Sequence, residues 1–204
     1  MERVPLKQAP SVWAPTSDPC FSCTVSCCRA FRIYMTPTDL HRISRGLGVP
    51  ASDFCLPVQC SGETRDHAHL AFSLGEEERF LLALHRRASG CVFLMKVGDH
   101  RRCGIHGVRP LVCRSYPLAW NRGRTCMAQQ ALCPQPWPTS SAVEAEWAAL
   151  HQQREQESFQ YQALLDTWHE EGLPALRATG LPTRAFRARF GFFLDFLANF
   201  PGSI

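Results

Sequence analysis

The sequence of 204 residues predicts a mainly helical α+β protein with a small antiparallel sheet. Two observations carry this prediction. The last third of the chain has apolar residues at helical spacing, and the middle has short apolar runs separated by turn residues. Hydrophobic residues make up 45% and charged residues 20%, which is typical of a folded, soluble protein. No apolar run approaches the roughly 18 residues of a membrane span, so we predict none.

We expect three parts along the chain. Residues 1–19 carry four prolines and no periodicity, which indicates an N-terminal arm. All the cysteines fall within residues 20–138, which we interpret as one cysteine-bearing domain. Residues 139–204 contain no cysteine and are expected to form a helical extension that packs on that domain.

The clearest helix start follows Thr36. Thr36 suits the N-cap, Pro37 the first helical position and Asp39 the capping box. One apolar stripe follows and two helix-ending residues close it (stripe Leu40, Ile43 and Leu47; ends Gly48 and Pro50).

The middle of the chain predicts the sheet. Residues 79–86 allow a helix or a strand, and we favour the strand. The segments 91–96 and 101–106 predict two further strands joined by a turn at 97–100, which would complete a small antiparallel sheet. Residues 109–138 contain five prolines and predict irregular structure with short helical turns.

Two helices are predicted in the last third. The first spans residues 142–171 and should end at Gly172 and Pro174. The second spans residues 183–199. Its aromatic stripe is interpreted as core and not as a cofactor site (Phe186, Phe190, Phe193, Leu194 and Leu197).

The chain has 11 cysteines, and four of them fall within nine residues (Cys20, Cys23, Cys27 and Cys28). Such a cluster favours metal binding, because intracellular thiols stay reduced and an odd total fits a disulfide framework poorly. Cys20-x-x-Cys23 is a usual start of a zinc or iron–sulfur site. Adjacent side chains diverge, so Cys27 and Cys28 indicate several metals, a bridging thiolate or a cluster wrapped by the loop. Thiolates select zinc, iron–sulfur or copper(I), and exclude magnesium and calcium.

Two blocks of sequence resemble a known family. The first is Cys20-x2-Cys23-x3-Cys27-Cys28, followed by Met35-Thr-Pro-Thr-Asp39 and Arg42-Ile-Ser-Arg-Gly-Leu-Gly48. The second is Gly90-Cys-Val-Phe-Leu94, followed by Cys103-Gly-Ile-His106 and Arg109-Pro-Leu-Val-Cys113-Arg-Ser-Tyr-Pro117. Over residues 20–135 the chain resembles the YkgJ-type cysteine-cluster proteins, which are described as zinc- or iron-chelating.

The resemblance implies eight metal ligands: Cys20, Cys23, Cys27, Cys28, Cys91, Cys103, Cys113 and Cys133. Cys133, which precedes Pro134, matches the family's last cysteine better than Cys126 does. The family usually places two residues before the third cysteine, whereas this chain places three, which forms a bulge or redirects Cys27.

Eight thiolates make two four-cysteine sites, for two zinc ions or two cubane clusters, or one polynuclear centre with bridging sulfur. The three cysteines outside the pattern are interpreted as buried or free thiols, with a role as extra ligands as the alternative (Cys55, Cys60 and Cys126).

Histidines and arginines give weaker candidates. His67 and His69 would share one face of a strand and form a metal pair, although exposed loop histidines are the simpler interpretation. His106, where the family usually has tyrosine, could ligate or hydrogen-bond a cluster sulfur. Arg109 and Arg114 flank Cys113, and they either offset the charge of the thiolates or form structural ion pairs.

Three functions are consistent with these residues. The first hypothesis is an iron–sulfur or polynuclear iron centre that serves redox chemistry or modification of a protein or peptide. The resemblance implies this, because the family includes iron–sulfur oxidoreductases and has a distant relative in flagellin lysine N-methylase. The alternatives are a zinc-stapled binding module and a metal storage or delivery protein. Whether the chain is an enzyme stays open.

The expected partner is a protein or peptide substrate. The 20 arginines and two lysines are scattered along the chain, so we expect neither nucleic acid nor a membrane as a partner. No nucleotide-binding or hydrolase motif is present in the sequence. A cytoplasmic location is expected.

Overall fold

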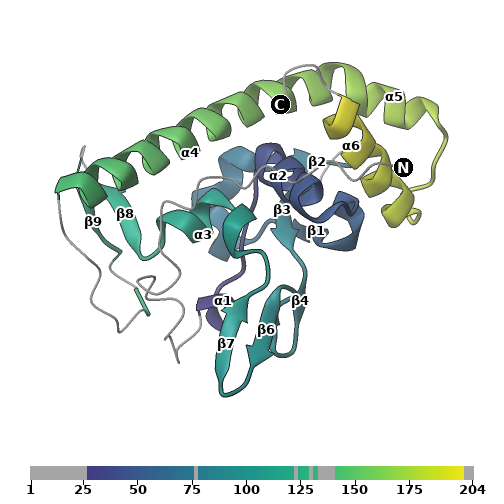
Figure 1. The fold of residues 1–204 in the computed structure, drawn as a ribbon. Helices are drawn as coiled ribbons and strands as arrows, with labels where there is room; N and C mark the ends of the chain where they lie inside the picture. The colour runs from purple at the N-terminus through teal and green to yellow at the C-terminus, as the bar shows by residue number, and fades with distance from the viewer. Residues whose placement is uncertain (1–26, 76–77, 122–123, 129–130, 133–140, 200–204) are drawn as a thin grey trace, which may run out of the picture.

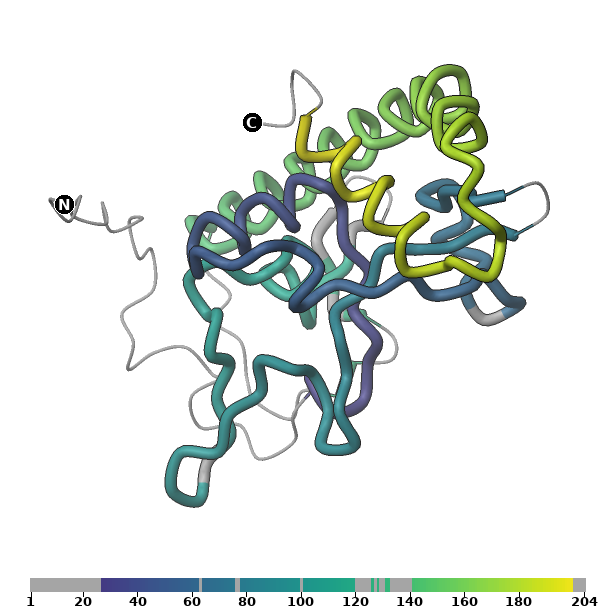
Figure 2. Tube along the Cα trace, turned by 90° about the vertical axis from the view of Figure 1, so that its right-hand side faces the viewer, coloured from purple at the N-terminus to yellow at the C-terminus, as the bar shows by residue number. Residues whose placement is uncertain are grey.

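The computed structural model describes residues 27–75, 78–121, 124–128, 131–132 and 141–199. As predicted, the fold is mainly helical α+β with a small antiparallel sheet. In Figure 1 the long helix α4 (Ser141–Thr167) runs along the upper edge, and the hairpin of β6 (Leu94–Val97) and β7 (His100–Cys103) projects at the lower end. Figure 2 shows the same hairpin projecting from the body in a perpendicular view.

The sheet has three antiparallel strands in the order β1-β3-β2. The strand predicted at 79–86 is confirmed as β3 (Arg79–Leu84), which lies between β1 (Cys55–Gln59) and β2 (Phe72–Ser73). The predicted pairing is wrong, because β6 and β7 pair only with each other among the described strands.

The physical reason for that pairing is burial. Every residue of β3 after Arg79 is buried, so this strand needs a neighbour at each edge and cover on both faces. The hairpin instead exposes about half of Met95 and Val97 (49% and 46%) and cannot cover an apolar strand. A short ladder of β4 (Arg86–Arg87) and β5 (Gly90–Cys91) links the sheet to the hairpin.

In the region predicted to be irregular, residues 109–138, the described residues form a short helix and an unpredicted hairpin. The helix is α3 (Leu111–Ser115), and the hairpin pairs β8 (Leu118–Asn121) with β9 (Arg124–Met127). Strands of four residues give too short an alternation to be recognised between so many prolines.

Helix α2 (Pro37–Leu47) confirms the predicted start and end. The Thr36 hydroxyl accepts a hydrogen bond from the Asp39 amide at 3.3 Å, and the Asp39 carboxylate accepts one from the Thr36 amide at 3.3 Å. Gly48 ends the helix with a φ of 68°, the left-handed conformation that glycine adopts without strain. Of the predicted stripe, Leu40 and Ile43 are buried, whereas Leu47 is 40% exposed.

Four shorter elements complete the first half: α1 (Cys27–Ala30) and the 3-10 helices η2 (Ala51–Asp53), η3 (Gly62–Leu70) and η4 (His106–Val108). Among the described helices, none combines the length and the apolar character that crossing a membrane requires.

The first C-terminal helix passes the residues that were predicted to end it. Helix α4 continues through the π-helical turn η5 (Trp168–Gly172) into α5 (Leu173–Ala178), where Pro174 occupies the first turn. The wider turn is closed by a bond from the Leu173 amide to the Trp168 carbonyl, and it accommodates a proline that would break a regular α-helix.

Gly172 is required at this turn by the ring of Trp168. A Cβ at position 172 would lie 2.1 Å from the nearest ring carbon of Trp168, which is fully buried. We expect Gly172→Ala to destabilise the protein by about 1–3 kcal/mol through overpacking. The matched control is Gly191→Ala in α6 (Phe186–Asn199), where a Cβ meets no atom within 4 Å. There alanine should stabilise by up to about 1 kcal/mol. Urea unfolding of both variants tests this, and equal effects would contradict the packing explanation.

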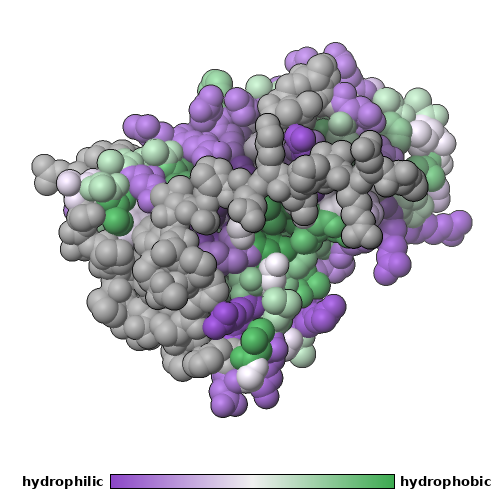
Figure 3. All heavy atoms as spheres, viewed as in Figure 1, coloured by the Kyte–Doolittle hydropathy of each residue, from purple (hydrophilic) through white to green (hydrophobic). Residues whose placement is uncertain are grey.

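Helix α6 confirms the prediction of an aromatic core stripe. Phe190, Phe193 and Leu197 are buried, and the Phe193 ring stacks on Phe72 of β2 with centroids 4.0 Å apart. Trp168 meets the edge of the same Phe193 ring at 4.8 Å. The sheet, α6 and the π turn therefore share one core. In Figure 3 hydrophobic residues gather in the centre of the view, and hydrophilic residues cover its upper and lower edges.

Candidate metal centre

Helix α1 carries Cys28 to the edge of β5, because Gly90 allows the two backbones to touch. A Cβ on Gly90 would lie 2.7 Å from the Cys28 carbonyl oxygen and 3.1 Å from the Arg29 Cα. The φ of Gly90 is 125°, which side chains other than glycine rarely allow. The next residue of β5 is Cys91, so this approach brings Cys28 close to Cys91.

Arg86 fixes the end of α1 in this position. Its guanidinium donates one hydrogen bond to the Arg29 carbonyl at 2.7 Å and a second to the Phe31 carbonyl. Arg86 also pairs with Cys91 across the β4–β5 ladder. One side chain therefore holds the Cys28 segment and places a positive charge beside the Cys91 thiol.

The β6–β7 hairpin brings Cys103 back toward Cys91. Cys103 is the last residue of β7 and lies opposite Leu94, the first residue of β6. The ladder is extended at this end by a bond of 2.8 Å from the Gly104 amide to the Phe93 carbonyl. The cysteines thus lie at the base of the hairpin, where it joins the body.

Cys113 belongs to α3, whose first turn is held from α2. The Pro110 carbonyl accepts hydrogen bonds from the amides of Cys113 and Arg114 at 2.9 and 3.0 Å. The amide of Leu111 donates to the buried Asp39 carboxylate at 3.0 Å. The position of Cys113 therefore depends on a residue 74 positions earlier in the chain.

Four of the predicted ligands act on one another electrostatically: Cys28, Cys91, Cys103 and Cys113, which we call the thiol cluster. Burial raises the pKa of Cys113 well above its ordinary value, and the thiols of Cys28, Cys103 and Cys91 raise it further. Burial, with Cys28 and Cys91, raises the pKa of Cys103 to about 11. Arg109 opposes both shifts, and Arg86 opposes the raised pKa of Cys91.

These shifts describe a set of protonated thiols. Metal binding would have to deprotonate them, so it would release protons. The bound cation would offset the repulsion between the resulting thiolates. Among the residues that the structure describes, no three potential ligands lie close enough to hold an ion as they stand. Four thiols that converge from separate elements are the donor set that zinc or iron prefers.

Of the other four predicted ligands, only Cys27 is among the described residues. Cys20, Cys23 and Cys133 lie outside the described residues. Cys27 is half-buried beside Cys28 in α1, but it is not among the groups that shift the pKa values of the cluster. This difference agrees with the divergence expected of adjacent side chains.

The three cysteines outside the family pattern also lie outside the thiol cluster. Cys55 is buried in the core, where burial raises its pKa to about 12. Cys60 and Cys126 are partly exposed, and the Cys126 thiol donates to the Ala119 carbonyl at 3.5 Å. None of the three is among the groups that shift the thiol cluster.

The two candidate histidines do not share a strand. His67 and His69 lie in the 3-10 helix η3 and not in a strand, so the predicted shared strand face is wrong. Their surroundings differ, since His67 packs on Tyr34 with ring centroids 4.8 Å apart and His69 contacts Ser158 at 3.4 Å.

Arg109 acts on the thiols, whereas Arg114 does not. The Arg109 Nε donates to the His106 carbonyl at 3.0 Å, which holds both residues at the base of the hairpin. Arg114 instead interacts with Arg42, Arg109 and the acidic residues Glu146 and Glu157. Of the two arginines flanking Cys113, Arg109 is thus the one placed to offset thiolate charge.

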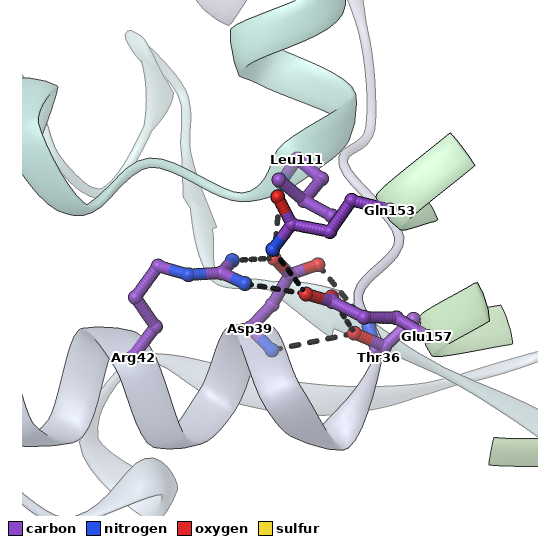
Figure 4. A network of polar contacts seen from close by, with 6 residues as sticks. All are labelled: Thr36, Asp39, Arg42, Leu111, Gln153 and Glu157. Atoms are coloured by element: carbon purple, nitrogen blue, oxygen red, sulfur yellow. Dashed lines mark hydrogen bonds and ion pairs between the residues drawn. The ribbon is translucent and has the colours of Figure 1, made fainter. Parts of the chain in front are cut away.

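A buried polar network that the sequence did not predict supports α3 (Figure 4). Arg42 bridges two carboxylates, Asp39 at 2.5 Å and Glu157 of α4 at 2.7 Å. Glu157 also accepts hydrogen bonds from Gln153 at 2.9 Å and from Thr36 at 3.3 Å. The network ties α2, α3 and α4 together behind Cys113. Sequence gave no signal for it, because Arg42 and Glu157 are 115 residues apart.

We expect Gly90→Ala to lower the metal content of the protein more than any other glycine substitution in this region. The added Cβ would push α1 away from β5 and separate Cys28 from Cys91. Gly98→Ala, in the β6–β7 turn, is the matched control, because its φ of 60° is also positive but its Cβ would meet nothing within 4 Å. Metal analysis of the purified variants tests this. Equal metal loss in both would mean that strain alone is responsible.

A thiol cluster at the junction of α1, a β-hairpin and a short helix defines a cysteine-rich protein built around a metal-binding region. Residues 19–134 match the model of the CxxCxxCC family, described as a "Putative zinc- or iron-chelating domain", and the chain belongs to this family. The match confirms the predicted resemblance and supports metal binding. No curated protein and no solved structure matches the chain.

Proposed function

We propose that the chain holds a multi-cysteine iron centre, in its simplest form iron–sulfur, which serves redox chemistry or the modification of a protein or peptide. The observation that carries this proposal is the convergence of Cys28, Cys91, Cys103 and Cys113 from four separate elements. The remaining candidates, Cys20, Cys23, Cys27 and Cys133, would supply the ligands of a second four-cysteine site or of a larger shared centre.

The count of thiols supports a polynuclear centre over a single structural ion. A structural zinc site needs four ligands and leaves no open position, whereas the resemblance to the family implies eight cysteine ligands in this region. The adjacent pair Cys27–Cys28 also agrees with more than one metal, because neighbouring side chains diverge and Cys28 acts on the other thiols of the cluster.

The residues around the thiol cluster would support a bound iron–sulfur centre by their charge and burial. When bound, an iron–sulfur centre supplies one-electron transfer. Arg86 and Arg109 would offset the negative charge of the thiolates, which favours the reduced state of such a centre. Burial would exclude water from the sulfur atoms, and the two short ladders would hold Cys91 opposite Arg86 and Cys103 opposite Leu94.

The test is anaerobic purification with a visible spectrum and measurement of iron, zinc and acid-labile sulfide per chain. A brown protein with absorbance near roughly 400 nm and matching iron and sulfide supports the proposal. A colourless protein with stoichiometric zinc would overturn it in favour of a zinc-stapled binding module. Metal that exchanges freely with a chelator, in amounts that follow supply, would instead point to storage or delivery.

A further inference from the structure

A second candidate site lies beside α3, and none of the four cysteines of the thiol cluster lines it. A cavity of about 680 Å³ opens between α4, η3, α3 and the segment that precedes α2. This volume is in the range of small-molecule sites, which is roughly 300–1,000 Å³. The lining combines charged and aromatic side chains, including Arg154, His67, His151, Tyr34 and Phe159.

The main evidence for a binding site is the environment of Arg154. This guanidinium is half-buried in the cavity wall and makes no hydrogen bond or ion pair with any residue that the structure describes. Burial, and next the charge of Arg154, lower the pKa of both His67 and His151, so Arg154 lies close enough to each imidazole to repel its protonated form. Burial also lowers the pKa of Arg154, and Asp39 and Glu155 oppose that shift without forming an ion pair with the guanidinium among the described residues. A half-buried cation without a directly paired anion is costly.

Among the described residues, no carboxylate of the lining makes a direct ion pair with Arg154. The carboxylates of Asp39 and Glu157 already accept hydrogen bonds from Arg42, and each accepts at least two more from neighbouring groups. Asp66 and Glu155 also line the cavity, but both are exposed to water. The open donors are therefore Arg154 and His67, whose ring contacts Tyr34 and makes no hydrogen bond among the described residues.

The mouth of the cavity adds an apolar feature. Phe159 of α4 is 73% exposed, the largest exposed fraction among the large apolar side chains that the structure describes, and it lines this cavity. Leu70, Val112 and Leu118 also contribute to the lining. An occupant with both an anionic group and an apolar body would engage both kinds of surface.

We propose that this cavity binds a small organic anion, whose carboxylate or phosphate oxygens contact Arg154 and His67 and whose apolar body packs against Phe159. This site is separate from the thiol cluster and does not depend on which metal the chain holds. It shares α3 with the cluster, since Val112 lines the cavity and Cys113 follows it in the chain. A ligand bound here would therefore lie next to the metal-binding region.

The test uses the full chain, as purified and with its metal content measured, titrated with benzoate and phenyl phosphate and followed by NMR signals of the His67 ring and the Arg154 side chain. Saturable shifts with either probe support the proposal, and the tighter of the two identifies the preferred anion. Benzyl alcohol, which is neutral, should bind at least about tenfold more weakly, because it lacks the charge-assisted contacts. Binding of benzyl alcohol equal to that of both anions would overturn the proposal, as would the absence of saturable shifts with both anions.

Three variants locate the site. Arg154→Gln should weaken anion binding by about tenfold or more. Arg187→Gln on the exposed face of α6 should leave it unchanged, since Arg187 lies outside the cavity lining. If Arg154→Gln alters the thermal melt, Arg154→Lys, which keeps the charge, serves as the folded comparison and should retain part of the affinity. Phe159→Ser should weaken benzoate but not inorganic phosphate. Wild-type affinity in both Arg154 variants would refute the site.

Discussion

Cys103→Ser is expected to remove about half of the metal bound by the chain, if eight thiolates form two four-cysteine sites. Cys103 acts electrostatically on Cys113 and is itself shifted by Cys28 and Cys91, so it is central to the thiol cluster. A serine hydroxyl does not ionise near neutral pH and is a poor ligand for a soft metal. The affected site should empty completely, because three remaining thiolates leave the coordination incomplete.

The same substitution should also lower stability. Metal binding at a site that forms only in the folded chain contributes its binding free energy to folding, so we expect the melting temperature to fall by roughly 10 °C or more. Cys113→Ser should behave alike, since it removes a ligand of the same cluster. Metal per chain, measured with calorimetric unfolding of the same preparation, gives both results.

Cys126→Ser is the matched control for the two ligand variants. Cys126 lies in the β8–β9 hairpin, and its thiol donates to a carbonyl that a serine hydroxyl can also reach. Metal content should stay at the wild-type value. Loss of a site in Cys126→Ser would show that Cys126, and not Cys133, is the last ligand, whereas unchanged metal in both Cys103→Ser and Cys113→Ser would refute the ligand assignment.

The sequence predicted the local features of this fold better than its long-range pairing. The capping box at Thr36 and the left-handed Gly48 are local signals, and both are present. The pairing of β3 with β1 and β2 depends on which apolar surfaces are covered, and no short window of sequence contains that information. Gly172 and Pro174 were misjudged because the π turn that accommodates them depends on how Trp168 packs.

The candidate site shows the same division. The resemblance to the family singled out Cys28, Cys91, Cys103 and Cys113 among its eight candidate ligands, and the structure brings these four into one thiol cluster. How the cluster is held was not predictable. The sequence does not show that Gly90 lies against the Cys28 carbonyl. It also does not show that Arg86 donates a hydrogen bond to α1. The groups that orient the ligands contact residues far away in the sequence, so no local spacing pattern identifies them.

Arg42→Met is expected to be the most destabilising substitution outside the thiol cluster. Arg42 is the only residue forming described ion pairs with Asp39 and Glu157, whose side chains are 4% and 6% exposed. Methionine fills a similar volume but leaves two buried carboxylates facing each other, for which we expect a loss of about 3–5 kcal/mol. Arg45→Met, on the exposed last turn of the same helix, should change stability by less than about 0.5 kcal/mol.

The pH dependence of Arg42→Met separates charge from packing. Burial raises the pKa values of Asp39 and Glu157, the charge of Asp39 raises the pKa of Glu157 further, and Arg42 lowers both values. Without Arg42 both pKa values should rise further in the folded state. A carboxyl group whose folded pKa is raised contributes stability below its unfolded pKa and loses it as pH rises through the folded pKa. The variant should therefore approach wild-type stability near pH 4 and fall well below it by pH 8.

A deficit in Arg42→Met that stayed constant from pH 4 to pH 8 would assign the loss to packing instead. Adding Glu157→Gln supplies the second measurement, because an amide needs no counter-ion and keeps an acceptor for Gln153. The double variant should regain stability at pH 8 but not at pH 4. Since Asp39 also holds the Leu111 amide, loss of this network should loosen α3 and reduce metal content even though no thiol is changed. That coupling would make the Asp39–Arg42–Glu157 network part of the metal-binding region in function as well as in structure.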